Sequence, residues 1–190
     1  MKIRNLLIAL VAIAGIFATA CTNKEAADTK ETTVLGVDAV LTDAETLLGD
    51  TISVEGLCSH LCKHGGRKAF LVGQDSTQVL RCEATAEMGG AFAPDCIGKE
   101  LTVTGIVREN RIDEEAVAAM EARQASLDSA AVAHEACDTE KKAQGQAGLS
   151  TFAERMADYR AKIADRNEKE GKAYLSFYYL EALSYEKEAE

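Results

Sequence analysis

Two cysteines and two histidines alternate along one short stretch of the sequence, at Cys58, His60, Cys62 and His64. In an extended strand, side chains two residues apart point to the same face. The four residues are therefore expected to form a column on one side of a strand and its turn. Thiolate and imidazole are the usual ligands of zinc, copper and iron. The spacing predicts a transition-metal site that uses two or three of these residues, because an extended strand spreads all four too far for one tetrahedral centre.

His134 and Cys137 are the candidates for additional ligands of this site. They stand three residues apart in a segment with helical periodicity, and positions i and i+3 share one face of a helix. The pair would complete the site if the fold brings it to the strand. No Cys-x-x-Cys pair occurs in the chain, so the pattern is neither that of a zinc ribbon nor that of covalent haem attachment.

The start of the chain has the layout of a secretory signal. Lys2 and Arg4 precede an uncharged apolar run at 6–17, which is too short to span a bilayer comfortably. The small residues 18–20 stand directly before Cys21, and this junction resembles the lipobox of bacterial lipoproteins, with alanine in place of the more usual leucine. Residues 1–20 are therefore predicted to be a signal peptide, and Cys21 a lipidated anchor. An ordinary secretory peptide cut near the same place is the alternative.

Residues 21–33 are predicted to be the lipidated cysteine and a flexible tether, because they contain no aromatic and no large aliphatic side chain. Signal cleavage removes two basic residues and no acidic one, so the mature chain is two units more negative than the −10 of the whole chain. This charge argues against nucleic acid as a partner. We expect a cell-envelope protein, lipid-anchored to the outer or inner membrane and either periplasmic or surface-exposed.

The remaining cysteines also allow interpretations other than metal binding. Cysteines of exported proteins often pair, and five cysteines are left once Cys21 carries lipid. At least one of them must then stay unpaired within the chain. Cys82 and Cys96 are the candidates for one disulfide, because they flank a short predicted helix. Structural disulfides or inert thiols, and thiol-redox chemistry, therefore stay open as alternatives.

Short strands separated by glycine turns predict a mainly β fold. Strands are expected at 50–62, 69–72, 77–84 and 101–107, with a short helix at 38–48 and a helical turn at 85–92. Gly56 marks a bulge or a bend in the first strand, and Gly65-Gly66 marks a hairpin. Three meandering strands, a short helix and a fourth strand follow the order of an OB-fold, a five-stranded Greek-key barrel.

Residues 173–185 are the candidate fifth strand. They hold four of the five tyrosines, and aromatic residues favour strands, whereas the leucine, alanine and glutamate residues there favour a helix. The strand interpretation is preferred because it closes the barrel. The barrel is then expected at 34–111 and 173–186, with a helical hairpin at 112–172 inserted between strands four and five. Asp113 as N-cap, a Thr151/Glu154 capping box and an apolar stripe from Phe152 to Ile163 support the two helices.

The stretch that contains the Cys/His cluster resembles a family of uncharacterised bacterial OB-fold lipoproteins. In that family a His-x-Cys-Lys-His-x-Gly-x-Lys-x-Phe-Leu motif recurs, and it is matched here by His60, Cys62, Lys63, His64, Gly66, Lys68, Phe70 and Leu71. The resemblance covers about residues 50–112 and a tyrosine-rich end near 178–185. It implies the OB-fold and the envelope location, and it implies that His60, Cys62 and His64 belong together for a chemical reason, but it implies no activity.

We expect a binding module rather than an enzyme. The chain contains no Gly-x-Ser-x-Gly, no phosphate loop, no dinucleotide fingerprint and no metalloprotease motif. Transition-metal binding at Cys58, His60, Cys62 and His64 is the favoured function, with zinc, copper or iron as the cofactor. The alternatives are a structural lipoprotein that binds a protein partner through its helical hairpin, and a thiol-redox protein.

Overall fold

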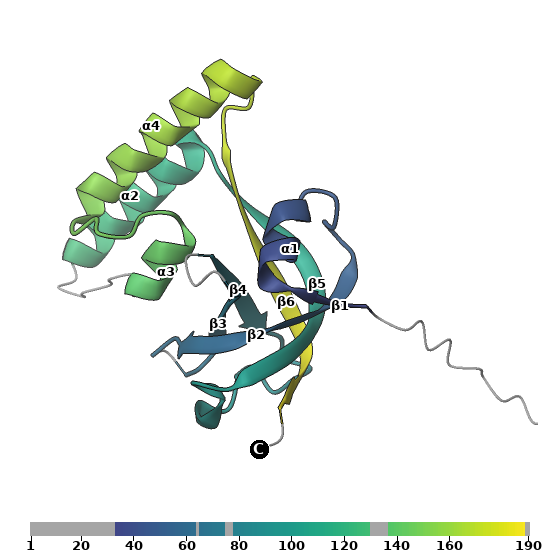
Figure 1. Ribbon diagram of the computed structural model, residues 1–190. Coiled ribbons are helices and arrows are strands. Elements are labelled where there is room, and N and C mark those ends of the chain that lie inside the picture. The colour runs from purple at the N-terminus through teal and green to yellow at the C-terminus, as the bar shows by residue number, and fades with distance from the viewer. Residues whose placement is uncertain (1–32, 64, 75–77, 130–136, 189–190) are drawn as a thin grey trace, which may run out of the picture. The chain divides into compact units, whose positions relative to one another are not determined.

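The computed structural model describes residues 33–63, 65–74, 78–129 and 137–188. All of them belong to one compact unit, and the predicted signal peptide and Cys21 lie outside the described residues. In chain order the strands are β1 (Val34–Gly36), β2 (Thr51–Leu61), β3 (Lys68–Val72), β4 (Val79–Ala84), β5 (Glu100–Ile112) and β6 (Leu175–Lys187). The helices are α1 (Val37–Asp43), the 3-10 turn Pro94–Cys96, α2 (Glu114–Ser129), α3 (Asp138–Ala143) and α4 (Phe152–Glu170) (Figure 1).

Five of the strands close into a mixed β-barrel. The sheet order is β1-β2-β3-β4-β6-β5, and a further pairing of β2 with β5 closes the ring of the five strands β2 to β6. The β4–β6 pair is parallel, and the other barrel pairs are antiparallel. The predicted OB-like barrel is therefore confirmed, and β6 is its fifth strand. The short strand β1, which pairs in parallel with the start of β2, is an addition to the predicted set.

The first barrel strand changes partner near its middle. Strand β2 pairs with β5 up to Leu57 and with β3 from Leu57 onward. Gly56 lies at this bend, and a Cβ there would come within 2.8 Å of Val37 and 3.1 Å of the Val72 carbonyl oxygen. The glycine therefore permits the close approach of α1 and β3. The register shift itself lies slightly later than predicted, between Cys58 and His60.

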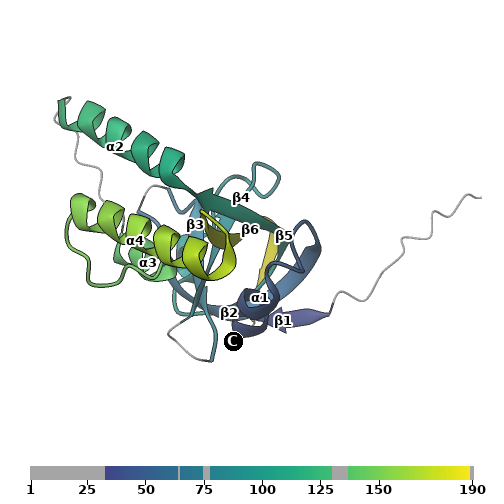
Figure 2. The same ribbon diagram turned by 90° about the horizontal axis from the view of Figure 1, so that it is seen from above.

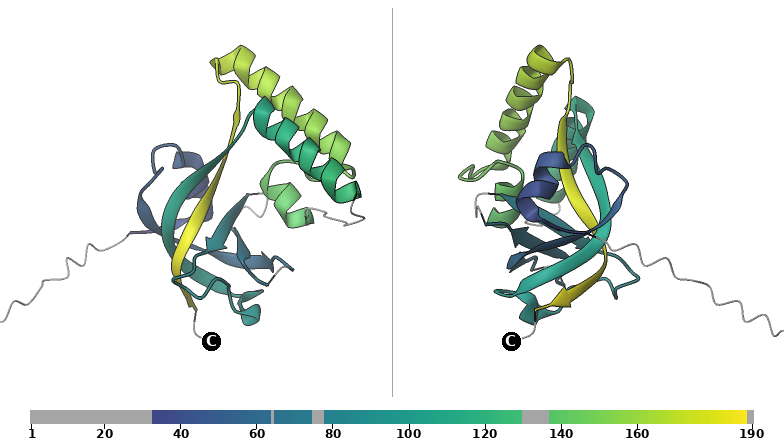
Figure 3. Two further views of the ribbon diagram at one scale, coloured as in Figure 1. Left: turned by 180° about the vertical axis from the view of Figure 1, so that it is seen from behind. Right: turned by 45° about the vertical axis from the view of Figure 1, so that its right-hand side comes forward.

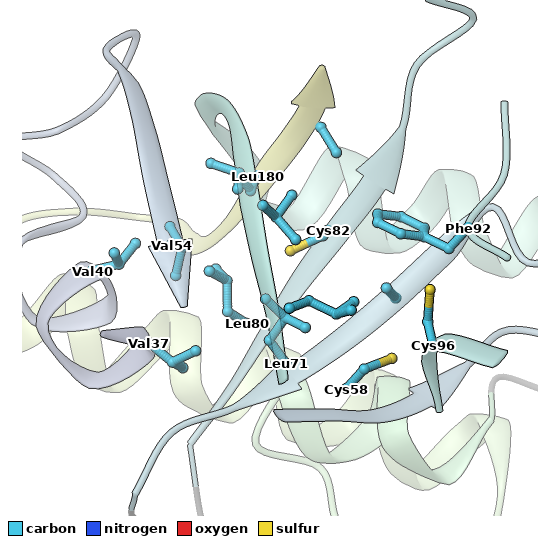
Figure 4. Packing of buried hydrophobic residues seen from close by; sticks show 14 of the residues in the cluster. Val37, Val40, Val54, Cys58, Leu71, Leu80, Cys82, Phe92, Cys96 and Leu180 are labelled. Atoms are coloured by element: carbon cyan, nitrogen blue, oxygen red, sulfur yellow. The ribbon is translucent and has the colours of Figure 1, made fainter. Parts of the chain in front are cut away.

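The barrel core is closed at both ends by segments between the strands. Val37 and Val40 of α1 pack into one end, and Phe92 and Cys96 pack into the other. Figure 4 shows these two pairs on opposite sides of Leu71 and the other central residues. This core is almost wholly apolar, so its stability comes from hydrophobic burial and close packing.

Strands β5 and β6 extend beyond the barrel as a two-stranded ribbon that carries the helical insertion. The two strands pair from Leu101 opposite Lys187 to Ile112 opposite Leu175. Helices α2 and α4 lie side by side at the end of this ribbon (Figures 1 and 3). Their seam is a second core, formed by Ile112, Val117, Met156, Tyr159 and Ile163. The apolar stripe of α4 from Phe152 to Ile163 forms its side of this seam.

Local signals fix where the two long helices begin and end. The Asp113 carboxylate accepts a hydrogen bond from the Ala116 N–H at 2.8 Å. Thr151 and Glu154 form the predicted capping box at the start of α4. Gly171 ends α4 with φ of 69°, a backbone conformation that glycine adopts readily.

The insertion contains one more helix than a simple hairpin. The short helix α3 follows α2 and lies beside β4, between α4 and the barrel (Figures 1 and 2). Cys137 is the N-cap of α3, with extended backbone angles. His134, the other candidate ligand of this segment, lies outside the described residues.

Candidate functional site

The bulge in β2 divides the predicted Cys/His column between the two sides of the barrel wall. Cys58 is fully buried in the barrel core. His60 and Cys62 pack on the outer side instead: the His60 ring lies 5.7 Å from the Phe70 ring, and Cys62 contacts the cluster around Phe70. Ser59 is the extra residue at the register shift. An extra residue reverses the side of a strand that the following side chains occupy, which accounts for the separation.

The other predicted ligands are only partly described. His64 and His134 lie outside the described residues. Cys137 packs on the same outer cluster as Cys62, and its Sγ accepts a hydrogen bond from the Glu140 N–H at 3.4 Å. Within the described residues, no three His, Cys, Asp or Glu side chains converge to hold a metal ion.

His60 has one feature that bears on ligand binding. Its Nε2 atom is buried, and the described residues provide no hydrogen-bond partner for it. A buried polar atom without a partner costs about 1–3 kcal/mol. A metal ion bound at Nε2 would remove this cost.

Three cysteines lie inside the barrel. Cys58, Cys82 and Cys96 have no exposed surface and are free thiols. Burial raises the pKa of Cys58 to about 11, and the nearby Cys96 adds to the shift. Burial also raises the pKa of Cys82 far above its ordinary value. Cys58 and Cys82 are therefore poor nucleophiles and poor metal ligands at neutral pH, because both roles require the thiolate.

The structure gives Cys96 a different neighbour from the one predicted. Cys58 donates its N–H to the Lys99 carbonyl at 2.9 Å and accepts from the Gly98 N–H at 2.8 Å, so it lies next to the segment that carries Cys96. Figure 4 shows the side chains of Cys58 and Cys96 at the same end of the core, with Cys82 further along it. The predicted bridge partners, Cys82 and Cys96, are free thiols here.

A charged cluster, formed by Lys68, Arg81 and Glu140, lies on the outer side of β3 and β4 under α3. One Glu140 carboxylate oxygen accepts from Arg81 Nη1 at 2.6 Å and the other from Lys68 Nζ at 3.1 Å. The Arg81 and Glu140 side chains are only 11% and 12% exposed. Burial raises the pKa of the Glu140 carboxyl, but Arg81 and Lys68 outweigh burial and hold the pKa below its ordinary value. Glu140 is therefore ionised at neutral pH.

The barrel itself holds Arg81 in position. Its guanidinium lies over the Tyr179 ring, 4.8 Å from the ring centre, and Tyr179 is its partner in the β4–β6 register. Glu83 Oε1 lies 3.1 Å from Arg81 Nε but outside hydrogen-bond geometry. The buried Nε therefore has no hydrogen-bond partner among the described residues.

The helical insertion holds Glu140 in position from the other side. Gln144 Nε2 donates to Glu140 Oε1 at 3.3 Å. The Gln144 side-chain oxygen accepts from the Tyr159 hydroxyl at 2.8 Å and from Arg155 Nη2 at 2.9 Å. Arg155 also donates to the oxygen of Gln146, whose side chain is buried. A continuous polar network therefore runs from α4 to the charged cluster.

A cleft of about 610 Å³ opens beside the charged cluster, between β4, β6, α3 and α4. Its lining combines apolar side chains, basic side chains and two carboxylates; it includes Val79, Leu175, Phe177, Arg81, Lys162, Arg166, Glu140 and Glu170. A smaller hollow of about 350 Å³ is lined by Arg81, Lys68, Tyr179, Asn110 and the carboxylates Glu83 and Glu109. Arg81 lines both spaces.

The sequence patterns do not predict the charged cluster. Lys68 belongs to them only as a motif position, and Arg81 and Glu140 do not belong to them. One signal was available: Arg81 stands between apolar neighbours in the strand predicted at 77–84, so alternation directs it outward. Nothing local indicates its partner, because Glu140 lies 59 residues further along the chain.

Comparison with known proteins adds little to this description. No protein-family model matches the chain, and no curated protein matches it. Among solved structures, a putative aspartyl-tRNA synthetase from Leishmania major Friedlin is similar over 51% of this chain and 19% of its own, with 19% identity and a TM-score of 0.28. This chain thus corresponds to about a fifth of the synthetase's length, and a likeness of this size carries no functional argument. The class established by the structure is an OB-like barrel with a helical insertion.

Among the helices of the described part, none combines the length and the apolar character needed to cross a bilayer.

Proposed function

We propose that this chain is a lipid-anchored protein of the cell envelope that binds a ligand in the cleft between its barrel and its helical insertion. The cleft of about 610 Å³ carries the proposal. Small-molecule sites commonly measure roughly 300–1,000 Å³ and combine apolar walls with a few polar groups. Val79 and Phe177 provide an apolar wall here, and Arg81, Lys162 and Arg166 provide the polar groups. The proposed role is binding rather than catalysis.

The lipid anchor is part of the proposal and rests on the sequence around Cys21. In the producing bacterium, a Cys21→Ser variant is expected to lose incorporation of radiolabelled fatty acid and to leave the membrane fraction. A Cys137→Ser variant is the matched control and keeps both properties. Unchanged labelling of Cys21→Ser would contradict lipidation at this residue.

The cleft is tested on the mature lipoprotein extracted from membranes in mild detergent. Native mass spectrometry of the wild type is expected to show a retained small molecule. Gln78 is exposed and lines the cleft, so a Gln78→Trp variant fills part of the space and loses that mass. Asn167 is exposed on α4, and an Asn167→Trp control keeps the mass. A wild type without bound ligand, or a Gln78→Trp variant that retains it, would overturn the proposal.

Metal binding is the second candidate function, and the buried Nε2 of His60 favours it. Such a site would use His60 with Cys62 on the outer side of β2, with zinc, copper or iron as the metal. Imidazole and thiolate fit these metals chemically. Cys58 is not included, because it lies inside the barrel.

Elemental analysis tests this second candidate. The mature protein is purified without a histidine tag, under reducing and oxygen-free conditions. Near-stoichiometric zinc, copper or iron that disappears in His60→Ala but stays in Cys82→Ala would support the site. A metal-free protein that also fails to bind added metal would eliminate it.

A further inference from the structure

We propose that Lys68 and Arg81 form a recognition site for an oxyanion, either a carboxylate or a phosphate, and that Glu140 occupies this site in the absence of ligand. The inference rests on the proposed function of the cleft and names the chemistry of the ligand group bound there. The ligand's anionic group would take the place of the Glu140 carboxylate between the two cations.

The geometry around Glu140 is that of a bound carboxylate. Each carboxylate oxygen receives a hydrogen bond from a different cation, at 2.6 Å from Arg81 and 3.1 Å from Lys68. Hydrogen bonds between ionised partners are the strong ones, and arginine is well suited to carboxylate and phosphate groups. A ligand carboxylate or phosphate presents the same acceptor atoms to the same donors.

The two cations do not depend on α3 for their positions. Lys68 begins β3, and Arg81 lies in the middle of β4. The Tyr179 ring supports the Arg81 guanidinium, and Glu83 contacts it from the same strand. These supports belong to the barrel, so the site keeps its form when Glu140 moves away.

The charges around the site favour an anion at this position. Glu83 lies 3.1 Å from Arg81 and 3.9 Å from Lys68, so one carboxylate stays with the two cations when Glu140 leaves. One positive charge of this group is then without an opposite charge. A nearby opposite charge stabilises a cation, so the departure of Glu140 favours the entry of another anion.

Arg81 also retains unused capacity for hydrogen bonding. Its Nε is buried and has no hydrogen-bond partner among the described residues, although Glu140 contacts Nη1. The guanidinium is a planar fork that can bind an oxyanion through two nitrogens. A ligand oxyanion that engages both Nε and an Nη nitrogen satisfies Arg81 better than Glu140 does.

The carrier of Glu140 is suited to displacement. Helix α3 has six residues, and isolated helices of this length are not stable. It is held on the barrel by the charged cluster and by contacts of Cys137 and Ala143 with the outer cluster of Phe70, Val72 and Val79. Its C-cap Gln144 is also tied to α4 by hydrogen bonds from Arg155 and Tyr159, so these bonds break or move with α3. Displacement of α3 therefore leaves the barrel core unchanged.

Anion titration by isothermal calorimetry tests the inference on the mature lipoprotein in detergent. Inorganic phosphate and citrate are used separately, so that the two oxyanion classes are distinguished. Glu140→Gln removes the competing charge and is expected to bind one of the probes at least tenfold more tightly than the wild type. Glu168→Gln, which removes the same charge from an exposed position of α4, is the matched control and binds like the wild type.

Two further variants identify the site. The double variant Glu140→Gln/Arg81→Gln is expected to lose the gained affinity. Glu140→Asp keeps the charge on a shorter side chain, so its affinity falls between those of the wild type and Glu140→Gln, and it serves as the test if Glu140→Gln does not fold. Equal affinity in wild type, Glu140→Asp and Glu140→Gln, or binding that survives the loss of Arg81, would overturn the inference.

Failure of this inference can be distinguished from failure of the proposed function. A cleft ligand that is retained by the wild type and lost in Gln78→Trp, together with no anion effect at Glu140, would leave the cleft function in place. Glu140 would then be a structural contact between the insertion and the barrel.

Discussion

The inner and outer sides of β3 and β4 are both buried, but by different means. On the inner side, Ala69, Leu71, Leu80 and Cys82 are at most 1% exposed and meet other apolar residues. On the outer side, Phe70 is equally buried, yet its neighbours in the strands are the charged Lys68 and Arg81. The closure of the barrel buries the inner side, whereas α3 buries the outer side.

A ligand can therefore enter on the outer side of these strands but not on the inner side. Apolar packing inside the barrel leaves no polar group for a ligand to replace, and opening it would cost the contacts of the whole core. On the outer side, the main polar contact is an ion pair, and another anion can replace one of its members. The same two strands therefore provide a permanent core on one side and an exchangeable surface on the other.

Truncation of a core residue on the inner side is expected to cause the largest loss of stability. Leu80→Ala removes a fully buried side chain and is expected to lower the free energy of unfolding by about 3 kcal/mol, because it leaves a cavity. Urea denaturation followed by circular dichroism measures the change. Leu48→Ala is the control, since Leu48 is 44% exposed and should cost less than about 0.5 kcal/mol. Similar losses in both variants would contradict the assignment of the core.

Removal of the Arg81 guanidinium from the outer side is expected to cause the second-largest loss of stability. Arg81→Ala leaves the buried Glu140 carboxylate with Lys68 and Gln144 as its partners and is expected to cost about 2 kcal/mol, somewhat below the loss for a fully buried pair. Arg108→Ala is a close control. Arg108 also contacts a glutamate, Glu181, at 2.6 Å, but its side chain is 44% exposed, so the loss should stay below about 1 kcal/mol. Equal losses would show that burial of the Arg81 pair has no energetic consequence.

Alkaline pH is expected to destabilise the inner side, because among the described cysteines only those inside the barrel are buried. Burial raises the pKa of Cys58 from 9.0 to about 11 in the folded protein, so deprotonation favours the unfolded chain. This contribution to stability is fully present below pH 9 and is lost as the pH rises towards 11, by about 1 kcal/mol at pH 10. Urea denaturation at pH 8 and pH 10 measures the loss. A Cys58→Ala/Cys82→Ala variant should lose less stability over this interval, and an unchanged loss would contradict the prediction.

Loss of one hydrogen bond from the polar network that links Glu140 to α4 is expected to cause the smallest loss of stability. Tyr159→Phe removes the hydroxyl that donates to Gln144 at 2.8 Å, while Arg155 still donates to the same oxygen. We expect a loss of about 0.5–1 kcal/mol in unfolding free energy. The phosphate or citrate affinity of the charged cluster should rise slightly, because Glu140 is held less firmly. A lower anion affinity in Tyr159→Phe would contradict this role of the network.

The parts of the fold that the sequence predicted correctly depend on local signals. The glycines predicted the β2–β3 hairpin and the bend of β2. The capping box predicted the start of α4, and the alternation of apolar and polar residues predicted the strands. The tyrosine-rich segment was correctly interpreted as β6, because barrel closure required another strand. Each of these signals lies within a few residues of the element that it determines.

The parts that were not predicted depend on contacts between distant segments. The bulge at Ser59 moves Cys58 to the opposite side of the wall from His60, and a shift of one residue leaves no mark in the alternation of residue types. The contact of Glu140 with Lys68 joins residues 72 positions apart. Short helices such as α3 also carry little periodic signal, so the element that covers the outer face was missed.

Native-state hydrogen exchange of α3 and β4 shows whether the outer face becomes accessible by local opening of α3 while the barrel stays folded. We expect the amides of Lys141 in α3 and of its C-cap Gln144 to exchange with a lower opening free energy than the amides of β4, and an anion bound at Arg81 to lower that free energy further. If α3 and β4 exchange only together, through global unfolding with and without added anion, then Glu140 is a fixed part of the core and α3 does not open locally.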